Sequence, residues 1–481
     1  MKKRLLFQVL CAAALLAAAP AGAQDGLRKS ITWSYIRSHA APLPVIGEVE
    51  AVHSVLDKPS RWSIGVETMD RDFALYSKFK GYVGETGAGY ARLQSGWAKT
   101  EKKKGKYSFA WLDEHVDGLI QEGLRPWMCL SYGNPLYSQH GADLNAKLFP
   151  DGPVMDAWLR YVRATVLHFK GRISMWEIWN EPDGRMNLDS YPLYANLFVR
   201  TARLIRELDP DAKIAAFGSC SPDRQYIRQA LKLIAEAGAL DLIDYITFHA
   251  YWPIPEKIVP AVKDLRADVD AYSASIGLLQ GETGCPSQLE YGHAMHSMSW
   301  DEYSQVKWDL RQMMNFWSLG IPYSVFTMVD LQYTNYMLQS FGLLRMNLNK
   351  EPIYKRPKFY AVQHVTSLFT PELEPDSSVK ACHGGSREVE CVGVSKGGKA
   401  VGCVLWFGGA RPTSNQERSY LDVSIDGIEF NEPVYIDLLT GYIHSLEKIA
   451  VKRNDHSYGF TTFSGLPLWD CPVLVIEKNA L

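Results

Sequence analysis

The chain has 481 residues, of which 47% are hydrophobic and 22% are charged. This is the composition of an ordinary globular protein, long enough for a large domain and a smaller one, and it excludes wholesale disorder. The formal net charge of −2 gives no reason to expect nucleic acid as a partner, because nucleic-acid binding needs clustered positive charge.

The first 23 residues differ in character from the rest. Basic residues at positions 2–4 precede an apolar run over residues 5–19, and small residues follow at 21–23. This order is typical of a cleaved signal peptide, so we expect a periplasmic or secreted protein. No later stretch has about 18 consecutive apolar residues, so no membrane insertion is expected. Cleavage would leave 48 basic and 53 acidic residues, a net charge of −5.

Residues 24–61 form an N-terminal extension, in which the segment over residues 31–35, Ile-Thr-Trp-Ser-Tyr, could supply an extra strand to either domain. From residue 62 onward, short apolar runs alternate with amphipathic segments. The runs predict eight strands, over residues 62–67, 88–94, 124–131, 173–181, 212–218, 242–249, 276–282 and 322–328. Helical periodicity is clear over residues 111–122, 155–169, 194–208, 223–237 and 303–319.

Eight strand–helix units predict an α/β fold of the (β/α)8 TIM-barrel type over residues 62–370. A doubly wound sheet is the rival fold, but no glycine-rich phosphate loop follows the first strand. After residue 370 strand-like runs dominate, at 389–394, 400–407, 433–437 and 473–477. They predict a smaller β-sandwich domain over residues 371–481. Because no long linker separates the two domains, we expect a packed interface between them.

The cysteines and histidines show no recognised metal-ligand spacing, so no metal or other cofactor is expected. His293 and His296 are three residues apart, but the nearby acids form no zinc pattern. Cys382 and Cys391 flank a predicted hairpin turn and could form a disulfide, with Cys403 as the competing partner. Cys129 lies in an apolar strand and is expected to be a buried small hydrophobe.

Two glutamates are placed where chemistry is expected in such a barrel. Glu181 ends the fourth predicted strand, within residues 176–182, Trp-Glu-Ile-Trp-Asn-Glu-Pro, and Glu282 ends the seventh. Active sites of (β/α)8 barrels lie at the carboxyl ends of the strands, and a facing pair of acids is what glycosidic bond cleavage requires. The alternative for Glu181 is a surface acid that complements a helix dipole.

On the motif Trp179-Asn180-Glu181-Pro182, the chain resembles the clan A glycoside hydrolases, most of all family 39 and its family 5 relatives. The resemblance extends over about residues 62–370 and to the architecture of the appended domain. It implies that Glu181 is the acid/base, that Asn180 binds the hydroxyl beside the anomeric carbon, and that Glu282 is the nucleophile.

The same resemblance implies supporting roles at two other strand ends. Arg92 ends the second strand, beside the expected nucleophile, where its positive charge would lower the pKa of Glu282. His249 and Tyr251 end the sixth strand and would contact the nucleophile and the sugar. An ordinary salt bridge for Arg92 and a satisfied core histidine for His249 are the alternatives.

Aromatic residues near the strand ends are expected to offer faces to sugar rings, although each is also a candidate packing residue. They are Trp97, Trp127, Tyr132, Tyr137, Trp252 and Tyr333. Asn134, just past the third strand, could bind a hydroxyl at the non-reducing end. The eighth strand lacks the tryptophan that many clan members carry, which leaves the identity of the sugar open.

These observations predict a retaining β-glycoside hydrolase that acts on plant or microbial carbohydrate by double displacement. Long segments at residues 132–152, 283–300 and 329–356 could wall off one end of the cleft, which favours exo action of the β-xylosidase type. Two alternatives stay open: an endo-acting β-glycanase, and a barrel that binds carbohydrate without cutting it. The sequence does not indicate an oligomeric state.

Overall fold

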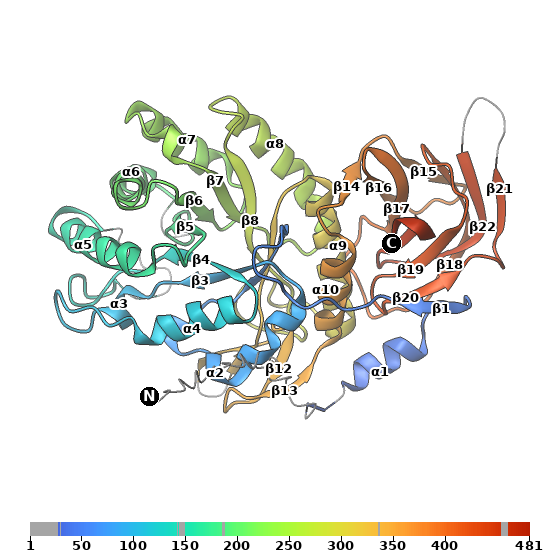
Figure 1. Ribbon diagram of the computed structural model, residues 1–481, viewed down its shortest axis with the longest axis horizontal. Coiled ribbons are helices and arrows are strands. Elements are labelled where there is room, and N and C mark those ends of the chain that lie inside the picture. Colours follow the sequence, from blue (N-terminus) through green and yellow to red (C-terminus); the bar gives the residue numbers. More distant parts are fainter. Residues whose placement is uncertain are drawn as a thin grey trace, which may run out of the picture.

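The structure is a computed structural model that describes residues 27–28, 30–141, 143, 150–184, 188–334, 337–453 and 460–481. The predicted signal peptide lies outside the described residues. Figure 1 shows a barrel wrapped by helices and, beside it, a sheet-rich part toward the C-terminus. Within the described residues, no helix combines the length and apolar character needed to cross a bilayer.

Eight parallel strands close into a barrel in chain order. They are β2 (Trp62–Gly65), β3 (Tyr90–Gln94), β4 (Arg125–Leu130), β5 (Met175–Ile178), β6 (Lys213–Ser219), β7 (Tyr245–His249), β8 (Gly277–Thr283) and β9 (Tyr323–Val325). The barrel closes where β2 pairs with β9, with Trp62 opposite Tyr323. Every strand overlaps the run that predicts it, so the (β/α)8 fold class is confirmed.

Seven helices of twelve or more residues surround the barrel in the described part of the chain. They are α4 (Ala110–Gln121), α5 (Gly152–Phe169), α6 (Tyr191–Leu208), α7 (Arg224–Glu236), α8 (Ile258–Asp270), α9 (Glu302–Ser318) and α10 (Pro357–Leu368). Shorter helices are α2 (Tyr76–Phe79) and α3 (Trp97–Thr100). Three of the long helices begin at an aspartate whose side chain accepts a first-turn backbone N–H, namely Asp151, Asp223 and Asp301.

The segment after β9 forms two hairpins, β10 (Leu331–Thr334) with β11 (Met337–Gln339) and β12 (Leu344–Met346) with β13 (Pro352–Lys355). Asp330 anchors this segment from a fully buried position. It accepts hydrogen bonds from Arg356 Nη1 at 2.7 Å and Nη2 at 2.9 Å, and from the backbone N–H groups of Gly342 and Met346 at 3.1 Å. One buried acid therefore ties both hairpin regions to the start of α10.

The C-terminal part consists of two antiparallel sheets, with strand orders β1-β20-β19-β23-β17-β16-β14 and β15-β18-β22-β21. Their strands after the barrel are β14 (Leu373–Asp376), β15 (Lys380–His383), β16 (Val389–Lys396), β17 (Lys399–Phe407), β18 (Ser419–Asp426), β19 (Pro433–Asp437), β20 (Tyr442–Ser445), β21 (Ala450–Arg453), β22 (Phe460–Leu468) and β23 (Val473–Glu477). Apolar side chains from both sheets are buried, as in a sandwich. The predicted β-sandwich is therefore found.

The strand expected at residues 31–35 is wrong, because this segment belongs to helix α1 (Ile31–Ser38). Ser30 caps the helix by accepting the N–H of Trp33 at 3.3 Å. The Trp33 ring is buried and stacks on Tyr360 of α10, with 4.3 Å between centroids. The extension does add a strand to the second domain, but at β1 (Val45–Glu48), which pairs with β20 (Figure 1).

Helices α9 and α10 lie between the barrel and the sandwich (Figure 1). Lys307 of α9 is fully buried and donates to the carbonyl of Thr413 at 3.0 Å and to Asp470 Oδ1 at 2.6 Å. Arg311, one turn further on, donates to Glu256 Oε1 at 2.8 Å and to the carbonyl of Ala410 at 2.9 Å. The expected packed interface is therefore present, and buried cations hold it together.

The proposed hairpin between Cys382 and Cys391 is also wrong. Cys382 lies on β15 opposite Ser424, whereas Cys391 lies on β16 opposite Leu405, so the two cysteines belong to different sheets. All cysteines of the described residues carry free thiols. Cys129 is fully buried, as expected for a small core residue.

Candidate active site

Glu181 lies just past the carboxyl end of β5, where the backbone turns sharply. Trp179 and Glu181 have φ angles of 73° and 50°, in the left-handed region that costs a residue with a Cβ about 1–3 kcal/mol. The N–H of Trp179 donates to the carbonyl of Leu130 at 3.1 Å, and the N–H of Glu181 donates to that of Gly218 at 2.8 Å. Hydrogen bonds to both neighbouring strands therefore hold this turn, which places Glu181 at the mouth of the barrel.

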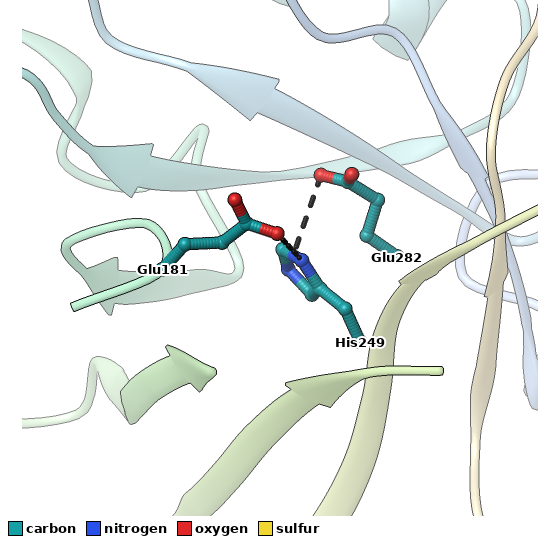
Figure 2. A group of neighbouring side chains, drawn as sticks. All are labelled: Glu181, His249 and Glu282. Atoms are coloured by element: carbon teal, nitrogen blue, oxygen red, sulfur yellow. Dashed lines mark hydrogen bonds and ion pairs between the residues drawn. The ribbon is translucent and has the colours of Figure 1, made fainter. Parts of the chain in front are cut away.

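Glu282 on β8 and His249 at the end of β7 meet Glu181 at this mouth. Figure 2 shows the imidazole of His249 between the two carboxylates. Its Nδ1 lies 2.9 Å from Glu181 Oε1, and its Nε2 lies 3.9 Å from Glu282 Oε2. One oxygen or nitrogen atom from each of the three side chains lies within 4.8 Å of the others. The two acids are therefore close neighbours, as the strand-end argument predicts.

Arg92 on β3 is fully buried and uses all five of its N–H groups within the site. Its Nε and Nη2 donate to Glu177 Oε2 at 3.0 and 2.7 Å, and Nη2 also donates to Asn180 Oδ1 at 2.8 Å. Its Nη1 donates to Glu282 Oε2 at 2.7 Å and to Glu67 Oε1 at 3.3 Å. Arg92 therefore lies beside Glu282, as expected, and fixes Asn180 as well.

Tyr251 and Asn180 complete the contacts around the two acids. The hydroxyl of Tyr251 donates to Glu282 Oε1 at 2.7 Å, so each oxygen of Glu282 accepts one hydrogen bond at that distance. Asn180 Nδ2 donates to the hydroxyl of Tyr132 at 2.8 Å. Tyr132 is buried and thus supports Asn180.

The charges at the site favour the ionised form of Glu282. Burial raises the pKa of Glu282, but the positive charges of His249 and Arg92 and the hydrogen bonds from Tyr251 and Arg92 outweigh burial, so the pKa lies below its ordinary value. Burial lowers the pKa of His249, whereas Glu282 and Glu181 raise it, and the net shift is upward. Glu282 therefore faces the guanidinium of Arg92 and an imidazole whose pKa is raised by the two acids.

An aromatic wall lies next to the two acids. Burial raises the pKa of Tyr333, and the carboxylates of Glu282 and Glu181 are near enough to raise it further. The Tyr333 ring contacts Phe73 and His293, with centroid distances of 4.5 and 4.3 Å. These residues follow three different barrel strands, β9, β2 and β8. Trp252 is half-buried, and its contact with a sugar stays a prediction.

The expectation that Trp97 offers a face to a sugar is wrong. The side chain is fully buried, and its two faces meet Tyr137 and Tyr161 at centroid distances of 5.3 and 5.5 Å. Its Nε1 donates to Glu101 Oε2 at 2.6 Å, and Tyr137 donates to the other oxygen of Glu101 at 2.6 Å. Trp97 and Tyr137 are therefore packing residues.

Asn134 and Trp127 are also placed away from a bound sugar. Asn134 is buried and donates to the carbonyl of Glu101 at 2.9 Å, while its Oδ1 accepts the N–H of Leu136 at 2.9 Å. It orders its own loop, so the predicted hydroxyl contact is wrong. Trp127 lines a hollow at the amino-terminal end of the barrel with Tyr90 and Tyr245.

Two buried acids of the site are missed by the sequence analysis. Glu67 lies just past β2, and Glu177 lies within β5, where its Oε1 accepts the hydroxyl of Thr247 at 2.6 Å. Each carries a signal that could have found it. Glu67 ends the first predicted strand as Glu181 ends the fourth, and Glu177 is a charged residue inside an apolar strand.

The three side chains of Figure 2 also resemble a set of metal ligands. A divalent cation among them would lie beside the guanidinium of Arg92, which already donates to Glu282 Oε2 at 2.7 Å. It would also compete with the bond between His249 and Glu181. This electrostatic setting suits an acid–base pair better than a metal centre.

Two sequence comparisons place the chain among known proteins. The sequence model of the Glycosyl hydrolases family 39 matches residues 92–262. Endo-1,4-beta-xylanase A of Thermotoga neapolitana is 25% identical over 209 residues, which are 40% of this chain and 20% of that protein. The chain thus spans about a fifth of the length of this curated relative.

Two solved structures share the fold. A family 39 glycoside hydrolase from Bacteroides cellulosilyticus WH2 is 17% identical with a TM-score of 0.64, over 89% of this chain and 83% of the other. A monomeric β-xylosidase from Caulobacter crescentus CB15 is 15% identical with a TM-score of 0.56, over 91% and 99%.

Fold, site and family match together give the chain a resemblance to the glycoside hydrolases. The chain resembles clan A, and within that clan it resembles family 39.

Proposed function

We propose that the protein is a retaining β-glycoside hydrolase that cleaves oligo- or polysaccharides by double displacement. The observation that carries this proposal is the closeness of Glu181 and Glu282, which have oxygen atoms within 4.8 Å of each other. Retaining enzymes keep their two carboxyl groups about 5–5.5 Å apart, whereas inverting enzymes need about 6.5–9.5 Å to admit a water. The gap here supports retention.

In the first step, the carboxylate of Glu282 attacks the anomeric carbon while the glycosidic C–O bond breaks and Glu181 gives its proton to the departing oxygen. In the second step, Glu181 takes a proton from a water whose oxygen attacks the same carbon, and Glu282 leaves as a carboxylate. Protons and electrons balance over the cycle, and the sugar keeps its anomeric configuration.

The neighbours of each acid suit its assigned role. Arg92 and Tyr251 hold Glu282 with one hydrogen bond to each oxygen, which favours the anion that a nucleophile must be. The hydrogen bond of His249 goes to Glu181 Oε1, so the proton for the leaving group is assigned to the other oxygen of Glu181. Asn180 keeps one amide N–H for the hydroxyl beside the anomeric carbon.

We further propose exo action on a β-xyloside-like substrate. The backbone N–H of Gln332 donates to the carbonyl of Phe73 at 2.8 Å, which ties the segment after β9 to that after β2. With His293, these segments form one closed side of the site. The xylosidase and xylanase among the similar proteins support a xylose-based substrate, and an endo-acting β-glycanase is the alternative.

A barrel that only binds carbohydrate is less favoured, because a pure binder gains little from placing two acids side by side. Secretion or export to the periplasm stays a proposal that rests on residues 1–23.

The test uses the purified chain with aryl β-xylosides, glucosides, galactosides and arabinosides. Proton NMR of the first-formed product reports the anomer. We expect turnover with the β-anomer formed first. The α-anomer as first product would refute retention, and no turnover on any of these or on β-glycans would favour the binding-only alternative.

A further inference from the structure

Glu67 is a buried acid of the site that the proposed double displacement does not use. It lies just past β2, and only 1% of its side chain is exposed. Gly65 makes the room for it, because a Cβ at that glycine would lie 2.2 Å from Glu67 Oε2. The fold therefore holds a specific place for this carboxyl group against Arg92.

Charged and titratable groups face Glu67 from several elements. They are Arg92 on β3, Glu282 on β8, Tyr251 after β7 and Tyr333 on β10, with Glu177 on β5 bound to the other side of Arg92. The guanidinium thus lies among three carboxyl groups, those of Glu67, Glu177 and Glu282. Three buried negative charges around one positive charge would be costly, which favours a proton on one of the three acids.

The hydrogen bonds indicate which acid carries that proton. Glu177 accepts three bonds of 2.6–3.0 Å, and Glu282 accepts two of 2.7 Å. Glu67 accepts only one bond from Arg92, and at 3.3 Å it is the longest of the five hydrogen bonds that Arg92 donates. Strong bonds go to carboxylates, so Glu67 is the acid with least support for a negative charge.

The far oxygen of Glu67 also has an acceptor within reach. Thr327 Oγ1 donates its one proton to the carbonyl of Gly65 at 2.8 Å and lies 3.5 Å from Glu67 Oε2. Because a hydroxyl has only one proton, and the shorter contact is to the carbonyl, Thr327 Oγ1 can act toward Glu67 only as an acceptor. Burial, strengthened by the charge of Glu282 and opposed by Arg92, raises the pKa of Glu67 to about 8.

We infer that Glu67 is a positioning residue: its neutral carboxyl group accepts one N–H of Arg92 and so fixes the guanidinium without competing with Glu282 for its charge. This inference rests on the proposed function only in its effect on turnover. The protonation of Glu67 is a property of the folded protein and can be measured without a substrate.

The direct test is the infrared difference spectrum between the native protein and Glu67→Gln at pH 6. We expect the carbonyl band of one protonated carboxyl group in the native protein, lost as the pH rises through about 8. Other buried acids cancel in the difference. Glu372→Gln is the matched control, because Glu372 is exposed and should show no such band. A carboxylate band lost from Glu67→Gln at pH 6 would overturn the inference.

Kinetics with an aryl β-glycoside test the positioning role. Because a neutral Glu67 puts no charge beside Glu282, we expect the acid limb of kcat/KM to stay in place in Glu67→Gln. A shift of that limb to lower pH would show that Glu67 is an anion. Glu67→Leu removes the acceptor for Arg92, and we expect it to lose at least ten-fold in kcat, most of which Gln restores. Equal activity of Leu and native protein would refute the positioning role.

The two proposals fail separately. A native protein that turns over no glycoside, yet shows the infrared band, would contradict the proposed function and leave the protonated Glu67 in place. If Glu67→Leu does not fold, the position of the acid limb of kcat/KM in Glu67→Gln still decides whether Glu67 is neutral or an anion.

Discussion

The imidazole Nδ1 of His249 lies 2.9 Å from Oε1 of Glu181, so the two side chains share one proton in a hydrogen bond at the mouth of the barrel. The strained turn after β5 and the end of β7 bring them together. Their pairing places Glu181 where it can transfer a proton to or from a bound substrate.

Glu181→Gln should lose turnover in a way that depends on the leaving group. General acid catalysis contributes roughly 10²–10⁴-fold, so we expect that loss for aryl β-glycosides with poor leaving groups. With a dinitrophenolate, which needs no proton, the first step should survive and give a burst of product. Stopped-flow absorbance measures both. Glu207→Gln, an exposed control, should behave as the native protein. An equal loss for good and poor leaving groups would exclude Glu181 as the acid.

Tyr251→Phe should move the acid limb of kcat/KM to higher pH. The Tyr251 hydroxyl lowers the pKa of Glu282 by donating to its anionic form at 2.7 Å, so its removal raises that pKa. A hydrogen bond to a charged group is worth about 1.5–3 kcal/mol, so kcat/KM should fall roughly 10- to 100-fold. A pH–rate profile measures both effects.

The control for this substitution is Tyr435→Phe, which removes a buried hydroxyl that donates to the Pro467 carbonyl at 3.1 Å in the sandwich. It should leave the acid limb unmoved. If Tyr251→Phe also left the acid limb of kcat/KM at the same pH, the ionisation of Glu282 would not be what sets that limb.

The central site could be predicted from sequence because strand ends of a closed barrel converge. Glu181 and Glu282 each end a clear apolar run, and the closure of the barrel alone brings them together. The supporting roles of Arg92 and Tyr251 are predicted by the resemblance to the clan A glycoside hydrolases. Once the strand order is known, residues far apart in the chain can be predicted to be neighbours as readily as residues close together.

The wrong predictions of sugar-contacting residues concern positions where the direction of the side chain decides whether it reaches the cleft. Trp97 and Asn134 follow strand ends as the true site residues do, but their polar atoms meet Glu101 and its neighbours instead of the cleft. A one-dimensional pattern does not tell which way a loop residue points. The strand predicted at residues 31–35 is wrong for another reason, because a pattern of five residues is too short to distinguish a helix from a strand. In the structure, the side chain of Ser30 caps the first turn and favours the helix.

Glu67→Gln should change how stability depends on pH. The pKa of Glu67 is about 8 in the folded protein, above its ordinary value near 4.5. The folded state therefore binds a proton that the unfolded state releases, and stability falls as pH rises from about 4.5 to about 8. Glutamine removes this loss. Denaturant unfolding measures the free energy of unfolding of both proteins. Between pH 5 and pH 8.5, the value for Glu67→Gln should rise relative to the value for the native protein. A constant difference across this range would contradict a raised pKa.

Asp330→Ala should destabilise the fold strongly. Asp330 neutralises the buried Arg356 through bonds of 2.7 and 2.9 Å, and removing one partner of a buried pair costs about 3–5 kcal/mol. Urea unfolding followed by tryptophan fluorescence measures the free energy. Arg163→Ala breaks an exposed pair with Glu207 and should cost about 0.5 kcal/mol or less. Similar costs for the two variants would contradict the anchoring role of Asp330.

The most direct measurement for the whole account is covalent trapping of the nucleophile. An activated 2-fluoro-β-glycoside of the preferred sugar slows the second step more than the first, so the glycosyl-enzyme accumulates. Peptide mass spectrometry after digestion should find the fluorosugar on Glu282, with no label in Glu282→Gln. A label on any other residue, or turnover of the sugar without a covalent adduct, would contradict double displacement through Glu282.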